Sequence, residues 1–208
     1  MSAYSFIQFI ACIILYTFDA LLSDNMFLAS DLFIIIPLAF SMCRTHPYHR
    51  LVPQRPTSSL MSFQVIASLA MQVVIHAFFQ TTVYLTATHL SWFTHCEPIA
   101  GSHNTSCLEV TIIFLASNFQ YVASVFAFSV SKPFRKPFYT NHLFVVFLIL
   151  AFGMSIWLAI YPFPVAVQTF FEMVLLPFSF RTFLLVMAFF NTALVYIAER
   201  VLIYATIE

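Results

Sequence analysis

The sequence predicts an all-α membrane protein with six transmembrane helices. Of its 208 residues, 62% are hydrophobic and only 8% are charged, and apolar runs recur along the whole chain. Soluble domains carry about 25% charged residues, so a chain of this composition buries its apolar surface in lipid. The formal net charge is zero, and no basic footprint indicates a nucleic-acid partner. The lipid bilayer is therefore the first predicted partner.

Six segments satisfy the requirement of about 20 apolar residues for one membrane crossing. Their limits are 3–22, 26–43, 60–88, 109–130, 141–160 and 181–204. The third segment is longer than a bilayer needs, so we expect it to tilt or protrude. The stretch from Pro162 to Pro177 is too short and too interrupted to span. It is expected to form a loop or a helix in the membrane interface.

The distribution of positive charge predicts the orientation, because Lys and Arg collect in short cytoplasmic loops. An even number of spans places loop 44–59, loop 131–140 and the end of the last helix on one side. Seven of the eight basic residues lie there: Arg44, Arg50, Arg55, Lys132, Arg135, Lys136 and Arg200. Only Arg181 lies opposite. Both termini are therefore predicted to be cytoplasmic.

The loop at 89–108 is predicted to be lumenal and carries two features that suit that side. Cys96 and Cys107 either form a disulfide or remain two thiols near the interface. Asn104 begins an N-glycosylation sequon, which is either used or lies too close to the membrane. The sequence contains no CxxC, HExxH, GxGxxG or Walker-type motif, so no metal and no cofactor is predicted for this chain.

The candidate binding residues lie on the first two predicted helices. Asp31 interrupts the apolar run FLASDLFIIIPLAF, and an acid at that depth costs roughly 2.5 to 3.5 kcal/mol on insertion scales. Helical spacing aligns Asp24, Phe27 and Asp31 on one face, and Tyr4 and Gln8 are one turn apart on the partner helix. Carboxylates, aromatic rings and an amide facing one another suit an organic cation, to which a ring adds about 0.5 to 2 kcal/mol.

Each of these residues also has a structural interpretation. Asp31 could be satisfied by a neighbouring helix, Asp24 could be a solvated acid in the lumenal turn, and Tyr4 and Gln8 could join helices. The expected depths place Gln8 about 10 Å nearer the cytoplasm than Asp31. That separation favours an extended amine over a monatomic cation.

Polar residues in the other spans are interpreted as contacts between helices. Gln72 and His76 share one face of the third span, and Asn118, Gln120 and Tyr121 lie in the fourth. Glu199 lies near the end of the last span, where we expect its side chain to reach the membrane surface and pair with Arg200 or another base.

Several segments together resemble a known family. YSFIQFIACIILYTF followed by LLSDNMFLASDL resembles the fifth and sixth transmembrane helices of the B branch of type-five P-type ATPases. RPTSSLMS is similar to the entry of the seventh helix, and SNFQYVASVFAFSVSKPFRKPFYTN to the eighth helix and its basic loop. NTALVYIAERVL is similar to part of the tenth helix. The resemblance covers nearly the whole chain and keeps the order of the segments.

The resemblance implies a pump that moves spermine or spermidine from the lumen of late endosomes or lysosomes to the cytosol. Residues 1–43 would be a transport-core helix pair, 44–59 a cytoplasmic loop and 60–208 four supporting helices. It also implies that Tyr4, Gln8, Phe27 and Asp31 lie along the polyamine path, with Asp24 at its mouth.

The chain lacks the DKTGT phosphorylation motif and a nucleotide-binding motif, although the family uses ATP and Mg²⁺. We therefore expect a C-terminal membrane portion without catalytic residues, whose partners are the missing N-terminal helices and cytosolic domains. The alternatives are a stand-alone six-helix scaffold or channel, or an inactive gene fragment.

Overall fold

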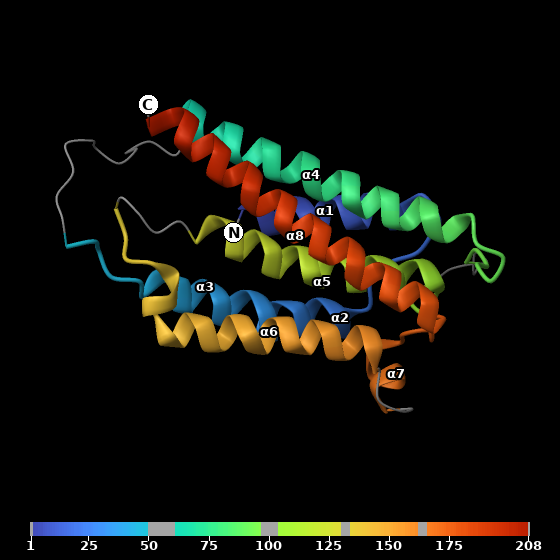
Figure 1. The fold of residues 1–208 in the computed structure, drawn as a ribbon. Coiled ribbons are helices and arrows are strands. Elements are labelled where there is room, and N and C mark those ends of the chain that lie inside the picture. Colours follow the sequence, from blue (N-terminus) through green and yellow to red (C-terminus); the bar gives the residue numbers. More distant parts are fainter. Residues whose placement is uncertain (1, 50–60, 97–103, 130–133, 162–165, 208) are drawn as a thin grey trace.

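The computed structural model describes residues 2–49, 61–96, 104–129, 134–161 and 166–207, and these ranges form helices joined by turns (Figure 1). The order is α1 (Ser2–Tyr16), α2 (Asp24–Ala29), the π-helix η1 (Ser30–Ile35), α3 (Ile36–Cys43), α4 (Phe63–Thr88), α5 (Leu108–Phe128), the 3₁₀-helix η2 (Phe138–Thr140), α6 (His142–Ile160), α7 (Ala166–Phe171) and α8 (Phe178–Ile207). Within the described ranges no strand forms, which confirms the all-α class.

Five segments of the described chain are long and apolar enough to cross a membrane. They are Asp24–Cys43, Phe63–Thr88, Leu108–Phe128, His142–Ile160 and Phe178–Leu202. The first predicted span is shorter than expected, because α1 ends at Tyr16 and not at residue 22. Its 15 residues measure about 22 Å, less than the roughly 30 Å of a hydrocarbon core. The sixth crossing and the side of the termini therefore stay predictions.

Helix α5 is the centre of the bundle. All its residues from 109 to 124 are buried, and it packs against α1, α4, α6 and α8 (Figure 1). A helix without a lipid-facing side can carry polar residues on several faces, provided that each finds a partner. Ser117, Asn118, Gln120 and Ser124 are such residues, and their partners lie on two different sides of α5.

The second span is not a uniform α-helix. It runs through α2, η1 and α3, and the π-helical segment ends just before Pro37. Proline has no backbone N–H, and its ring clashes with the carbonyl four residues earlier, which here is Phe33. Wider π-helical turns relieve that clash, and they occur often at functional sites.

The two predicted cytoplasmic loops lie side by side where they are described. The Tyr48 N–H donates to the Phe134 carbonyl at 3.0 Å, and the Lys136 N–H to that of His46 at 3.0 Å. Figure 1 shows the start of α1 and the end of α8 at this same end of the bundle. Arg50, Arg55 and Lys132 fall outside the described residues.

Arg181, the one basic residue predicted on the opposite side, binds backbone carbonyls there. Its Nε donates to Leu176 O at 2.7 Å and its Nη1 to Ile160 O at 3.1 Å. The guanidinium therefore joins the end of α6 to the start of α8. The stretch after Pro162, predicted as a loop or interfacial helix, contains the short helix α7, and the Asn25 amide donates to its Phe170 carbonyl at 2.9 Å.

Candidate functional site

Asp31 and Tyr4 meet between η1 and α1. The Tyr4 hydroxyl donates a hydrogen bond to Asp31 Oδ1, and both side chains are half-buried. The Tyr4 ring packs edge-on against Tyr121 of α5, with ring centroids 5.0 Å apart. Apolar side chains of α1, η1, α3, α5 and α6 surround this contact, among them Ile7 and Ile34. The structure thus brings an acid, a hydroxyl and two aromatic rings to one place within the bundle.

Gln8 belongs to the same group, which corrects the predicted separation of about 10 Å. It lies one turn after Tyr4 on α1 and is partly buried, as Tyr4 is. The reason is the early end of α1. Gln8 lies eight residues before Tyr16 and Asp31 lies seven after Asp24, so the two reach similar depths from the turn. The geometry therefore does not by itself favour a long amine over a compact one.

Ser30 fixes the π-helical segment against α5. Its Oγ donates to Asn118 Oδ1 at 2.9 Å, and both residues are buried. This contact is next to Asp31 in the chain, so it sets the position of the helix that carries the acid. The predicted role of Asn118 as a contact between helices agrees with this bond.

Asp24 and Phe27 do not join the group around Asp31. Asp24 is exposed in the first turn of α2. Phe27 packs against the other apolar cluster of the bundle, which includes Leu15 and Met26. The π-helical segment begins at Ser30, just before Asp31, so the common face that regular α-helical spacing gives Asp24, Phe27 and Asp31 stays a prediction.

The predicted lumenal loop carries a disulfide between Cys96 and Cys107, with the sulfurs 2.09 Å and the Cα atoms 5.9 Å apart. Glu109, which is fully buried, accepts a hydrogen bond from the Cys96 N–H at 3.1 Å and contacts His95 Nδ1 at 3.3 Å. The two sulfurs and this carboxylate lie within 4.8 Å of one another. Because the sulfurs are bonded to each other, they do not offer the thiolates that a metal ion would bind.

Asn104, the predicted glycosylation residue, packs against the turn after α1. Its N–H donates to Asp19 O at 3.3 Å, and its carbonyl accepts from the Leu21 N–H at 3.0 Å. The residue is only 9% exposed. In this conformation a glycan would require the turn to open, so glycosylation stays a prediction that the geometry does not favour.

The predicted role of Tyr121 as a contact between helices agrees with its packing on Tyr4 of α1. Sequence reasoning missed one part of the site. The π-helix was not foreseen, although Pro37 after the run FIII is a signal that the α-helical period breaks before it.

The bundle and its half-buried acid define a helical membrane protein with a polar site between its first two helices. No family model matches the chain. It is 38% identical over 163 residues to polyamine-transporting ATPase 13A2 of Mus musculus, covering 78% of this chain and 14% of that protein. It is 33% identical over 159 residues to the vacuolar cation-transporting ATPase YPK9 of Saccharomyces cerevisiae, covering 76% and 11%.

A third relative extends the match along more of the chain. Polyamine-transporting ATPase 13A3 of Homo sapiens is 30% identical over 213 residues, covering 92% of this chain and 17% of that protein. The chain is thus homologous to the 13A family of P-type ATPases. It spans less than a fifth of the length of the relatives it matches.

Proposed function

We propose that this chain is the membrane part of an ATP-driven polyamine transporter, and that Asp31 binds an ammonium group of the substrate. The observation that carries the proposal is the contact of Tyr4 with Asp31 between α1 and η1. Asp31 is half-buried, so its carboxylate keeps a side open to a ligand while the surrounding apolar residues strengthen its attraction for a cation.

Each neighbour of Asp31 has a role in this proposal. The Tyr4 hydroxyl orients the carboxylate, and the Tyr4 and Tyr121 rings supply cation–π surface. Gln8 offers an amide oxygen to the same ammonium or to the next one along the molecule. Such a site binds a primary or secondary amine better than a hydrated metal ion, because it offers few oxygen ligands.

The remaining predicted residues would lie toward the outer end of the path. Asp24, exposed in the first turn of α2, would attract the cation before it enters. Phe27 would pack on the methylene groups of a substrate that extends from Asp31 toward that end. We propose lumen-to-cytosol movement across a late endosomal or lysosomal membrane, with spermine or spermidine as substrate.

The residues of this chain do not fit ATP or Mg²⁺. Phosphoryl transfer needs an acceptor carboxylate in its own motif, metal ligands and a phosphate-binding loop, and the sequence has no DKTGT and no Walker-type motif. We therefore propose that any ATP and Mg²⁺ are bound by other domains of the working pump.

Spermine binding tests the proposal directly. The chain is reconstituted in lipid nanodiscs, and binding of radiolabelled spermine is measured for the wild type, Asp31→Asn and Asp19→Asn. A charge-assisted hydrogen bond contributes about 1.5 to 3 kcal/mol, so Asp31→Asn should weaken binding about tenfold or more. Asp19→Asn is the matched control: it removes an exposed acid from the turn between α1 and α2 and should leave the spermine affinity almost unchanged. Equal affinities in all three proteins would contradict the assignment of Asp31.

A second readout connects binding to transport. The residue at the position of mouse polyamine-transporting ATPase 13A2 that corresponds to Asp31 is replaced by asparagine, and spermine-stimulated ATP hydrolysis is measured. We expect the spermine concentration for half stimulation to rise at least about tenfold, for the same electrostatic reason. Unchanged stimulation would remove this residue from the substrate site.

A further inference from the structure

One face of α4 is polar along most of its length and is turned away from lipid. Ser68, Gln72, His76, Gln80 and Tyr84 follow one another at intervals of four residues, and none is more than 9% exposed. At a rise of 1.5 Å per residue this polar stripe of α4 extends about 24 Å, most of the thickness of a hydrocarbon core. The sequence predicts contacts with other helices for Gln72 and His76, which are two of the five residues of this stripe.

The polar stripe of α4 is bonded to α8 at one end. Ser68 Oγ lies 2.7 Å and 2.9 Å from the two oxygens of Glu199, and Gln72 Nε2 donates to Glu199 at 3.1 Å. Glu199 is only 5% exposed, so the prediction that it reaches the surface and pairs with a base is wrong. Helix α8 continues to Ile207, two turns beyond Glu199, which places this carboxylate inside the bundle.

The middle of the stripe is bonded to α5. Ser124 Oγ lies 2.8 Å from His76 Nε2, and Gln120 Nε2 donates to the His76 carbonyl at 2.9 Å. One turn further, Gln80 Nε2 donates to Ser117 Oγ at 3.0 Å. These bonds lie on a different side of α5 from Asn118 and Tyr121, which face the Asp31 site.

The bonds leave six buried polar atoms of this region without a partner among the described residues. They are Gln72 Oε1, His76 Nδ1, Gln80 Oε1, Tyr84 Oη, Gln120 Oε1 and Asn191 Oδ1. All six can accept a hydrogen bond. A buried polar atom without a partner costs about 1 to 3 kcal/mol, so six of them together would be a heavy penalty for one helix interface. A small molecule that enters the interface and donates hydrogen bonds to these atoms would remove this free-energy penalty.

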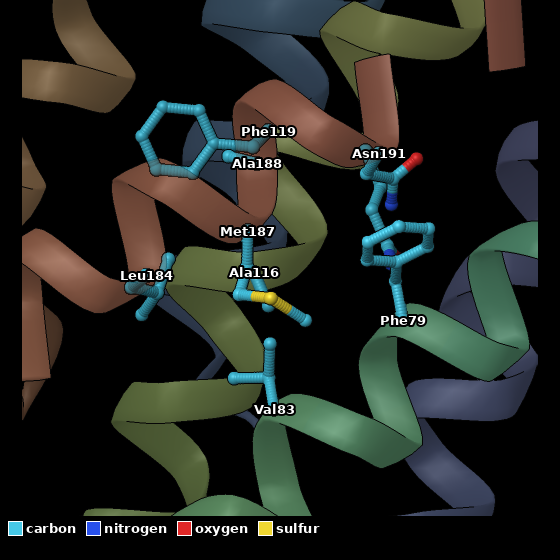
Figure 2. Close-up of a pocket in the computed structure, with 9 residues that line it drawn as sticks. Phe79, Val83, Ala116, Phe119, Leu184, Met187, Ala188 and Asn191 are labelled. Carbon is cyan, nitrogen blue, oxygen red and sulfur yellow. The ribbon is translucent and has the colours of Figure 1, made fainter. Parts of the chain in front are cut away.

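A cavity lies beside two of these six atoms, between α4, α5 and α8. Gln120 and Asn191 line it together with apolar residues such as Phe79 and Met187, and Figure 2 shows Asn191 and Phe79 beside each other at its rim. The volume within which the centre of a water molecule can lie is about 10 Å³. That is close to the smallest volume, by this measure, in which one bound water fits. The cavity is thus small, and polar on one side only.

We propose that the cavity beside the polar stripe of α4 holds one ordered water molecule, which donates hydrogen bonds to Gln120 Oε1 and Asn191 Oδ1. These two atoms belong to the six acceptors without a partner, and both residues line the cavity, which has room for one water. Water is favoured over a cation, because the rest of the cavity lining is apolar and contains no carboxylate.

Radiolytic footprinting in ¹⁸O-labelled water tests the proposal on the full chain in nanodiscs. Hydroxyl radicals form from bound water, so they oxidise a buried side chain that touches such a water and introduce ¹⁸O. Phe79, 8% exposed and in the cavity wall, should be labelled several times faster than Phe144, which is 1% exposed and belongs to the apolar cluster around Ile34. Equal labelling of the two rings would overturn the proposal.

Two variants and one salt series separate water from the alternatives. Gln120→Leu and Asn191→Leu remove the acceptors of the cavity, and labelling of Phe79 should fall to the level of Phe144. Asn118→Ala, on the other side of α5, should leave the labelling of Phe79 unchanged. Unaltered labelling in both leucine variants refutes the water site, and so does labelling that potassium, ammonium or spermine chloride suppresses, since a cation then occupies it.

Two checks keep the result decisive. If a leucine variant does not fold, as judged by circular dichroism, Gln120→Met is used instead and should reduce the labelling of Phe79, and of Val83 in the same cavity wall, in the same way. Asp31→Asn should not affect the labelling at all, so loss of spermine binding and loss of the bound water are separate outcomes.

Discussion

Two polar regions lie on different sides of α5, and they differ in burial. Asp31 is half-buried and accepts a hydrogen bond from Tyr4, next to a π-helical distortion. Glu199 is 5% exposed and binds Ser68 and Gln72 on a regular helix. A half-buried carboxylate keeps lone pairs for a ligand, whereas a buried one with several donors holds helices together. The comparison teaches that depth alone does not identify a binding acid, and that unused hydrogen-bonding capacity is what distinguishes Asp31, the proposed binding acid, from Glu199.

Replacing Glu199 should cause the largest loss of stability. Glu199→Ala leaves Ser68 Oγ without its acceptor and removes one of the two acceptors of Gln72 Nε2, which also donates to Val195 O at 3.3 Å. A buried donor without an acceptor costs about 1 to 3 kcal/mol, and the second lost bond adds to that. We expect a loss of roughly 2 to 4 kcal/mol, measured as thermal unfolding in a mild detergent. Glu199→Gln keeps one acceptor oxygen and should lose clearly less.

Asp31→Ala is the matched control for that comparison. Its partner Tyr4 is only half-buried, so the expected loss is near the average of about 0.6 kcal/mol for one hydrogen bond between membrane helices. A loss as large as that of Glu199→Ala would mean that Asp31 is a structural acid, and the difference between the two regions would disappear.

Pro37→Ala should separate stability from binding. It restores a backbone N–H and removes the clash that accompanies the π-helix, so the second span should become a more regular helix and the protein slightly more stable. The same change turns Asp31 away from Tyr4, and spermine affinity in nanodiscs should fall about tenfold, the loss of one charge-assisted contact. Unchanged affinity would show that the π-helix does not position Asp31.

Asn118→Ala should have a smaller effect on both measurements. It removes the acceptor of Ser30 Oγ, and that hydroxyl can turn to a backbone carbonyl of its own helix. We expect a stability loss of about 0.6 to 1 kcal/mol and a two- to threefold loss of spermine affinity, because η1 is held less firmly on α5. A loss of stability with unchanged spermine affinity would show that the bond between Ser30 and Asn118 holds the helices together but does not position the proposed binding site.

Much of the bundle could be predicted from the sequence, because apolar runs of about 20 residues and the positions of Lys and Arg carry direct physical information. The long helices α4, α5 and α6 begin and end within three residues of the predicted spans where they are described. The first span was predicted too long, since four of the six residues from 17 to 22 are apolar: Phe18, Ala20, Leu21 and Leu22. There the chain turns, and Asp19 adopts a φ of 52°, which no hydropathy pattern reveals.

The candidate site could be predicted in part. An acid in an apolar run identified Asp31 as a candidate. The contact with Tyr4 was not foreseen, because the expected depths set the polar residues of the first helix nearer the cytoplasm than Asp31. The face shared with Phe27 stays a prediction, because periodicity assumes a regular α-helix and the chain is π-helical from Ser30 to Ile35. Glu199 was misjudged for a related reason: distance from the end of a span does not say which neighbouring helix a side chain meets.

Tyr4→Phe is the most delicate comparison, since it removes one hydroxyl and keeps the ring packed on Tyr121. Asp31 loses its hydrogen bond but can be solvated, so stability should fall by only about 0.6 kcal/mol. Spermine affinity should fall about threefold, because the carboxylate is no longer oriented while its charge remains. Tyr121→Phe is the matched control: it removes a hydroxyl one ring further from Asp31 and should leave the affinity unchanged. Equal losses in the two variants would show that general packing at α5, and not the bond from Tyr4 to Asp31, determines how the amine is held.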